Sequence, residues 1–106
     1  MRDEEDLALV MPGARPWFPA KDWKSDSFIF EGERDVWLSM MIANAPGTGA
    51  LSRLMAAIWA QGKRVVVPNP FARMEAILRA KGFELEPGHP CDVWVKPPHT
   101  PSEGER

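Results

Sequence analysis

Residues 44–67 read NAPGTGALSRLMAAIWAQGKRVVV, and this stretch decides the fold. Within it, apolar side chains recur at intervals of three and four residues, the spacing of one buried helix face. They are Leu51, Leu54, Met55 and Ile58. Gly62 ends the predicted helix, and residues 63–67 then supply the apolar run that is typical of a strand buried on both faces. A helix that leads into a buried strand predicts an α/β domain with a parallel crossover.

The flanking sequence supplies the other elements of this domain. Strands are expected at residues 28–30 and 36–42, joined by a hairpin at 31–35, and later at 83–86 and 92–95. Asn69 is a suitable N-cap with Pro70 at the first helical position, and this second helix ends at Gly82. The predicted order is β-β-α-β-α-β-β. It describes a single small α/β (α+β) domain whose mixed sheet has one parallel crossover pair and antiparallel edge strands.

The two ends of the chain are expected to differ from this core, which spans residues 27–97. Residues 1–26 are expected to form a loop-rich segment whose aromatic side chains pack on the domain, with a short helix over residues 3–10. Residues 98–106 are polar and are expected to form a flexible tail.

Composition argues against several classes of protein. With 106 residues and 44% hydrophobic content, the chain suits one modest core. Its net charge of -2 argues against a nucleic-acid partner. Residues 51–82 nevertheless carry six Lys or Arg and one Asp or Glu, a net charge of +5. Such a segment suits either an anionic ligand or two helices with solvated basic faces.

Neither a metal site nor a membrane span is expected. The chain has one cysteine, Cys91, and no Cys/His cluster of the kind that holds zinc. No apolar run approaches the roughly 20 residues that cross a bilayer, and the acidic start is unlike a secretory signal. A reducing, cytoplasmic location is therefore expected.

The segment between the second strand and the first helix is the most informative for function. Gly47 and Gly49 remove side chains where the backbone turns, so successive N–H groups can point at one anion, and the helix N-terminus adds about half a positive charge. The segment therefore indicates either a phosphate cradle or a tight turn. It lacks the Gly-Lys-Ser/Thr of a Walker loop, and Ser52 stands where a dinucleotide-binding loop has its third glycine.

These residues resemble the GNAT N-acetyltransferase superfamily. Its members carry Arg/Gln-x-x-Gly-x-Gly/Ala after a strand; Gly47 and Gly49 match, and Asn44 stands where Arg or Gln is usual. Residues 71–83, a helix ending in Gly-Phe, resemble the second signature of the family, and the likeness covers residues 35–96. The resemblance implies the C-terminal, acetyl-CoA-binding half of that fold. The cofactor-binding residues that it implies are Asn44, Gly47, Thr48, Gly49, Ala50 and Asn69.

The chain also departs from the family, as a truncated or divergent member would. It contains no tyrosine, and Leu78 stands where the family often has the tyrosine that protonates the leaving thiolate. Phe71 stands where a cofactor-contacting asparagine is usual. The N-terminal half of the family fold, which builds most of the acceptor pocket, is reduced to residues 1–26. No catalytic residue is assigned.

Three functions stay open. The first is an acyltransferase that binds acetyl-CoA and transfers the acetyl group to an amine, largely by orienting the two reactants. The second is a catalytically inactive, GNAT-like structural or assembly protein, of the kind that phages carry in the virion, which binds other protein chains or forms an oligomer. The third is a generic α/β binding domain in which the glycine loop is only a turn.

Overall fold

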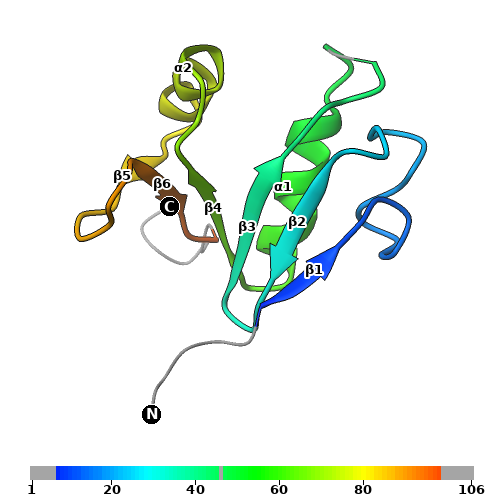
Figure 1. The fold of residues 1–106 in the computed structure, drawn as a ribbon, viewed down its shortest axis with the longest axis horizontal. Helices are drawn as coiled ribbons and strands as arrows, with labels where there is room; N and C mark the ends of the chain where they lie inside the picture. Colours follow the sequence, from blue (N-terminus) through cyan, green and yellow to red (C-terminus); the bar gives the residue numbers. More distant parts are fainter. Residues whose placement is uncertain (1–6, 46, 99–106) are drawn as a thin grey trace, which may run out of the picture.

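Residues 7–45 and 47–98 are described by a computed structural model, in which they form six strands and two helices. The strands are β1 (Ala8–Val10), β2 (Phe28–Glu31), β3 (Asp35–Met40), β4 (Arg64–Pro68), β5 (Glu84–Leu85) and β6 (Val93–Lys96). The helices are α1 (Ala50–Ala60) and α2 (Ala72–Ala80). The strands make one sheet in the order β1-β2-β3-β4-β6-β5 (Figure 1).

One pair of neighbouring strands in this sheet is parallel. β3 and β4 run in the same direction because α1 returns the chain to the end of the sheet at which β3 began. The other neighbours are antiparallel. The expected mixed sheet with one parallel pair is thereby confirmed. The Cα radius of gyration, 13.8 Å, is that of a compact domain of about 100 residues.

The main core lies between α1 and one face of the sheet. α1 buries most of the stripe that its sequence predicts, with Leu54, Met55 and Ile58 at most 2% exposed, while Leu51 lies half-buried at the margin. Alternation along the strands turns every second side chain toward this face. The buried strand residues of the main core include Val10, Ile29, Val36, Leu38, Val65 and Val67.

The opposite face of the sheet carries no helix among the described residues (Figure 1), and we call it the helix-free face. Three valines of β4 and β6 form a second, smaller cluster there with Trp37. Phe28 and Phe30 occupy the same face by strand alternation, and their rings meet edge to face with 5.6 Å between centroids. The helix-free face is therefore partly apolar.

The N-terminal end of the domain differs from expectation. Residues 8–10 form the edge strand β1, so the expected short helix over residues 3–10 is wrong here; residues 3–6 lie outside the described part. Pairing with β2 satisfies backbone groups of β1, and this tertiary contact outweighs local helix propensity. Phe18 and Trp23, from the connection to β2, are buried in the main core. The tail residues 99–106 also lie outside the described part.

The second helix starts later than Asn69 and Pro70 indicate. α2 begins at Ala72, with Phe71 as its N-cap in an extended conformation. Asn69 instead adopts a positive φ of 47°, and its N–H donates to the carbonyl of Asp92. A hydrogen bond to the neighbouring loop, and not helix capping, therefore holds Asn69 at the end of β4.

Candidate functional site

β3 and β4 separate after three paired residues, and Pro68 explains where they do so. The parallel register ends at Trp37 opposite Val66. The backbone N–H of Arg64 donates to the carbonyl of the residue before β3. Alternate residues of β4, counted from Arg64, therefore direct their N–H groups toward β3. The next rung would therefore need an N–H from residue 68 to the Leu38 carbonyl. Proline has no N–H, so the ladder stops and the strands diverge, as Figure 1 shows.

A β-bulge in β3 lies next to this point. The register between β2 and β3 shifts between Phe28 and Ile29, which leaves Ser39 as an extra residue in β3. Bulges bend the strand that carries them, so β3 is bent close to the point where it leaves β4. A cavity of about 250 Å³ occupies the gap, and its lining includes Leu38, Met40 and other apolar side chains of the two strands.

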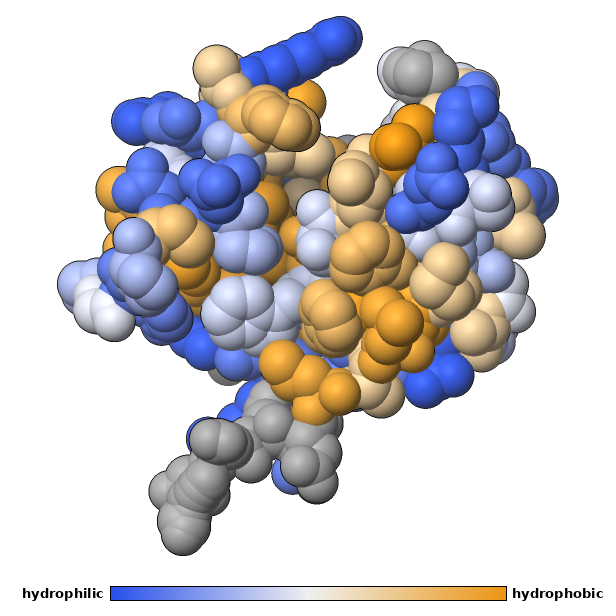
Figure 2. Space-filling view, in the orientation of Figure 1, coloured by the Kyte–Doolittle hydropathy of each residue, from blue (hydrophilic) through white to orange (hydrophobic). Residues whose placement is uncertain are grey.

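A second cavity continues the first one toward α1. It has a volume of about 410 Å³ and reaches Gly47 and Leu51 at the start of α1. The residues that line both cavities are Met41, Ile42, Phe71 and Met74. We call this continuous depression the β3–β4 groove. The surface in Figure 2 is hollowed accordingly at its upper edge, between α2 and the segment that follows β3.

The start of α1 presents backbone N–H groups at one end of the groove. Gly47 and Gly49 have positive φ values of 85° and 86°, a conformation that other residues rarely adopt. Gly49 is the N-cap of α1. Within the described residues, no side chain caps the first turn and no acidic residue lies in it. The first-turn N–H groups and the helix dipole therefore favour an anion here.

Hydrogen bonds within the glycine loop hold its shape. The side-chain amide of Asn44 donates to two carbonyls of the N-terminal segment, at 3.3 and 3.0 Å. The Thr48 hydroxyl donates to the Ala45 carbonyl at 2.6 Å, and Arg53 donates to the Thr48 carbonyl at 2.8 Å. These polar groups of Asn44 and Thr48 are thus already engaged in fixing the loop against the rest of the domain.

Two residues on the groove wall carry donors that have no acceptor in the described chain. Trp23 is 3% exposed, and its buried indole N–H has no hydrogen-bond partner there. Arg73, in the first turn of α2, forms no ion pair or hydrogen bond through its side chain within residues 7–45 and 47–98. A buried donor without a partner costs about 1–3 kcal/mol. The exposed Arg73 guanidinium, by contrast, is accessible to a ligand with acceptor oxygens.

The predicted cofactor-binding residues fall into two groups. Gly47 lines the larger cavity, and Asn69 lines the smaller one. The others support the loop, cap α1 or lie in the core, and they are Asn44, Thr48, Gly49 and Ala50. The structure thus brings Gly47 and Asn69 to opposite ends of one groove, whereas the remaining four do not line either cavity.

Sequence reasoning missed much of the groove wall. Phe71 is 85% exposed at the N-cap of α2 and lines both cavities. Trp23 and Arg73 also belong to no predicted site. Pro68 carried a usable signal, because a proline at the end of a buried strand cannot extend the ladder. The exposure of Phe71 has no comparable signal in the sequence.

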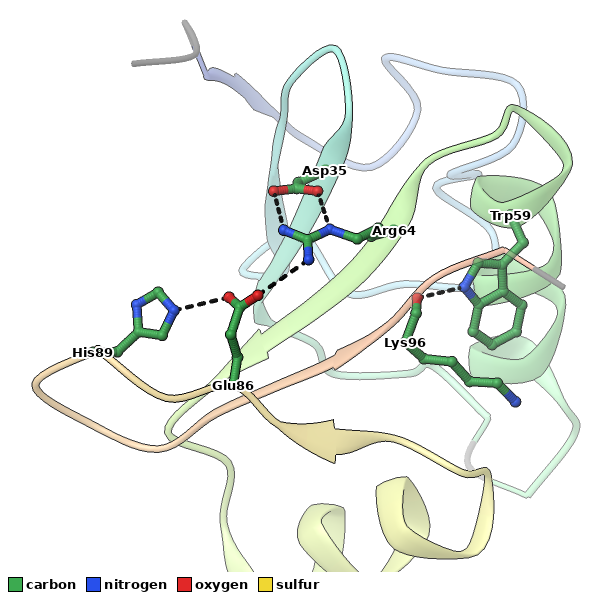
Figure 3. A network of polar contacts seen from close by, with 6 residues as sticks. All are labelled: Asp35, Trp59, Arg64, Glu86, His89 and Lys96. Atoms are coloured by element: carbon green, nitrogen blue, oxygen red, sulfur yellow. Dashed lines mark hydrogen bonds and ion pairs between the residues drawn. The ribbon is translucent and has the colours of Figure 1, made fainter. Parts of the chain in front are cut away.

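Some of the positive charge in residues 51–82 is bound to carboxylates away from the groove. Arg64 makes a two-pronged ion pair with Asp35 at 2.7 and 2.9 Å and also reaches Glu86 at 3.1 Å (Figure 3). Hydrogen bonding to Asp35 raises the pKa of Arg64. A hydrogen bond with His89 lowers the pKa of Glu86, and Arg64 lowers it as well, against the opposing effect of partial burial. This cluster ties the β5–β6 hairpin to β3 and β4.

Three further observations bear on the class of protein. Residues 7–45 and 47–98 contain no group of three or more His, Cys, Asp or Glu side chains placed to hold a metal ion. In the same ranges, neither helix has the length and apolar character needed to cross a membrane. Comparison with protein-family models, curated proteins and solved structures finds no match to the chain. Fold and site together define a small α+β domain with a largely apolar groove that ends at a helix N-terminus.

Proposed function

We propose that the chain binds a coenzyme A thioester in the β3–β4 groove and transfers its acyl group, acetyl in the simplest case, to an amine. The observation that carries the proposal is the groove itself, which joins a site for an anion to a narrow gap between two strands. Coenzyme A has a matching form, with a pyrophosphate near one end and a long amide-bearing arm that leads to the thioester. The glycine loop and the element order support a GNAT-like assignment of the fold and the same cofactor.

The pyrophosphate would lie at the start of α1. The first-turn N–H groups of α1 and the Arg73 guanidinium belong to this end of the groove, and both are donors. Neither cavity is lined by an aspartate or a glutamate among the described residues. Donors without competing carboxylates favour a ligand that carries negative charge and several acceptor oxygens.

The arm of the thioester would lie between β3 and β4. Because Pro68 leaves the Leu38 carbonyl without its rung partner, that carbonyl can accept a hydrogen bond from an amide of the arm. Met40 and Met41 border the same gap, and methionine side chains adapt readily to the shape of a bound ligand. The ligand would thus supply the contacts that the two diverging strands do not make with each other.

The proposed transfer needs few groups from the protein. The amine nitrogen attacks the thioester carbonyl carbon, the C–S bond breaks, and the departing thiolate takes up the proton that the amine releases. Holding the two reactants together can supply roughly 7–11 kcal/mol of the barrier in the best intramolecular cases. We assign no side chain as acid or base, so the proposed catalysis rests on orientation.

Calorimetric titration of the full chain with acetyl-CoA tests the proposal. Saturable binding is expected, and Arg73→Glu should weaken it at least about tenfold because a carboxylate would repel the pyrophosphate. Lys24→Glu is the matched control, since it reverses the charge of an exposed residue outside the groove. No binding by folded wild-type protein, or equal weakening by both variants, would sink the proposal.

A second candidate is a catalytically inactive assembly protein, which the partly apolar helix-free face favours. Such a protein would use its sheet to contact other chains and would have no need of the groove. The same titration separates the two candidates, because a folded chain that does not bind acetyl-CoA excludes the acyltransferase and is compatible with the assembly function.

A further inference from the structure

The free edge of β1 is an exposed surface that the proposed acyl transfer does not use. β1 pairs with β2 on one side, and no strand of residues 7–45 and 47–98 pairs with it on the other (Figure 1). Every second side chain along this edge is an exposed apolar one, namely Leu7 (44% exposed), Leu9 (58%) and Met11 (42%). Sheet edges ordinarily carry charges, prolines or bulges that prevent pairing with other chains. Residues 7–11 contain no charged residue and no proline, and their pairing with β2 is regular.

The direction of the backbone groups at this edge follows from the register of the sheet. Gly32 donates its N–H to the Asp35 carbonyl across the β2–β3 hairpin, so alternate residues of β2, counted from Gly32, face β3. The residues between them face β1, where they pair with Ala8 and Val10. Leu9 lies between Ala8 and Val10. Its N–H and C=O therefore point away from β2, toward the open edge.

The apolar side chains of the edge continue onto the helix-free face. Val10 is 2% exposed in the main core, so its neighbour Leu9 projects from the opposite face of the sheet. Leu9 pairs with Phe30, which stands on that face. Figure 2 shows the resulting apolar surface gathered over β1 and β2. The edge thus combines backbone groups that have no partner strand in the described part of the chain with an apolar strip, the two features that strand pairing between chains requires.

We propose that β1 pairs in antiparallel fashion with β1 of a second copy of this chain, so that Leu9 faces its counterpart across a two-fold axis. In this register Leu7 of each copy stands opposite Met11 of the other, and the exposed apolar side chains meet in cross-strand pairs. Because the strands are identical, every contact away from the axis occurs twice, as a closed dimer requires. The two sheets then become one continuous sheet.

Charge favours the antiparallel direction and permits a second copy as the partner. The edge itself is uncharged, so two copies can approach without repulsion along it. The sequence immediately before Leu7 is acidic, with four carboxylates in residues 3–6. Antiparallel pairing directs these two acidic stretches to opposite ends of the contact, whereas parallel pairing would bring them together. A contact limited to one strand edge falls below the about 1,200 Å² of standard interfaces, so the dimer exchanges with monomer.

Sedimentation equilibrium of the full chain over a concentration series tests this proposal. The mean mass should rise with concentration from 11.9 kDa toward twice that value. Leu9→Lys removes the central apolar pair and places two ammonium groups opposite each other, so this variant should stay monomeric throughout. Leu85→Lys is the matched control, because Leu85 is a 51% exposed leucine on β5, the opposite edge of the sheet. It should associate as the wild type does.

Amide hydrogen exchange gives a second readout that a general loss of solubility would not imitate. The Leu9 N–H should exchange more slowly as the concentration of wild-type protein rises, and should show no such change in Leu9→Lys. A wild-type chain that is monomeric at every concentration overturns the proposal and leaves the edge for a different protein. Association that survives Leu9→Lys but is lost in Leu85→Lys also overturns it, because the contact then lies at β5. Neither outcome bears on acetyl-CoA binding.

Discussion

Replacing Pro68 by valine should extend the ladder between β3 and β4 by one rung. Residue 68 faces β3, and valine would offer the Leu38 carbonyl the N–H that proline lacks. Valine also favours extended backbone and keeps an apolar side chain at this position. The substitution therefore changes one backbone hydrogen bond at the entrance of the groove and little else.

The expected magnitude follows from two opposing contributions to the free energy of unfolding. A backbone hydrogen bond stabilises by about 0.5–1.5 kcal/mol. Loss of the rigidity of proline in the unfolded chain costs about 0.4–1 kcal/mol. Stability should therefore change by less than about 1 kcal/mol. Affinity for acetyl-CoA should change more, falling at least about tenfold, or about 1.4 kcal/mol, because the Leu38 carbonyl is engaged and the gap is narrower.

Urea unfolding and calorimetric titration measure the two quantities separately. Pro87→Val is the matched control, because it makes the same chemical change in the exposed turn between β5 and β6. It should bind acetyl-CoA as the wild type does. A Pro68→Val variant that keeps its stability and also keeps wild-type affinity would refute the reasoning that the interrupted ladder forms the ligand site.

Three other predictions concern the groove, acid stability and the core. Phe71→Ala removes a ring that is 85% exposed, so the free energy of unfolding should stay within about 0.5 kcal/mol of the wild-type value. The affinity for acetyl-CoA should fall, and an unchanged affinity would exclude the ring from the site. Partial burial raises the pKa of Glu31, but hydrogen bonds from Lys63 and Arg15 lower it below its ordinary value of 4.5 overall. The stabilisation that Glu31 gives at neutral pH should therefore be lost as the pH falls through its lowered pKa. Urea unfolding should show that acidification lowers the free energy of unfolding less in Glu31→Gln than in the wild type. An equal decrease in both proteins would mean that other carboxylates dominate the acid sensitivity. Ile58→Ala, at a position 0% exposed in α1, should lower the free energy of unfolding by about 2–5 kcal/mol, and a cost below about 1 kcal/mol would contradict the packing of α1 on the sheet.

Strong burial patterns made the centre of the fold predictable. The three valines of residues 65–67 are at most 5% exposed, as a strand covered on both faces should be. The apolar stripe from Leu54 to Ile58 packs against the sheet at helical spacing. Both patterns rest on many buried contacts, so local alternatives could not compete with them.

Elements that depend on a single tertiary contact were not predictable. β1 is short, and only its pairing with β2 distinguishes it from the start of a helix. The start of α2 moved because Asn69 is held by a hydrogen bond to Asp92, a partner more than twenty residues away in the chain. Local capping preferences do not include such long-range bonds.

The glycine loop was identifiable from its sequence, but the groove was not. Gly47 and Gly49 adopt the positive φ that their spacing before a helix indicates. The apolar walls come from segments on both sides of the gap between β3 and β4, and their meeting depends on the missing rung at Pro68. The unpartnered donors of Trp23 and Arg73 appear only when every neighbour in the described chain is known.

Mapping of backbone amide chemical shifts during addition of acetyl-CoA tests the central claim most directly. Binding in the β3–β4 groove predicts the largest changes at Gly47 and Leu51, near the pyrophosphate, and at Met40 and Met41, along the arm. The edge strand β1 should be unaffected. Saturating acetyl-CoA that leaves these amides unchanged, or that shifts instead the residues around Lys24, would contradict it.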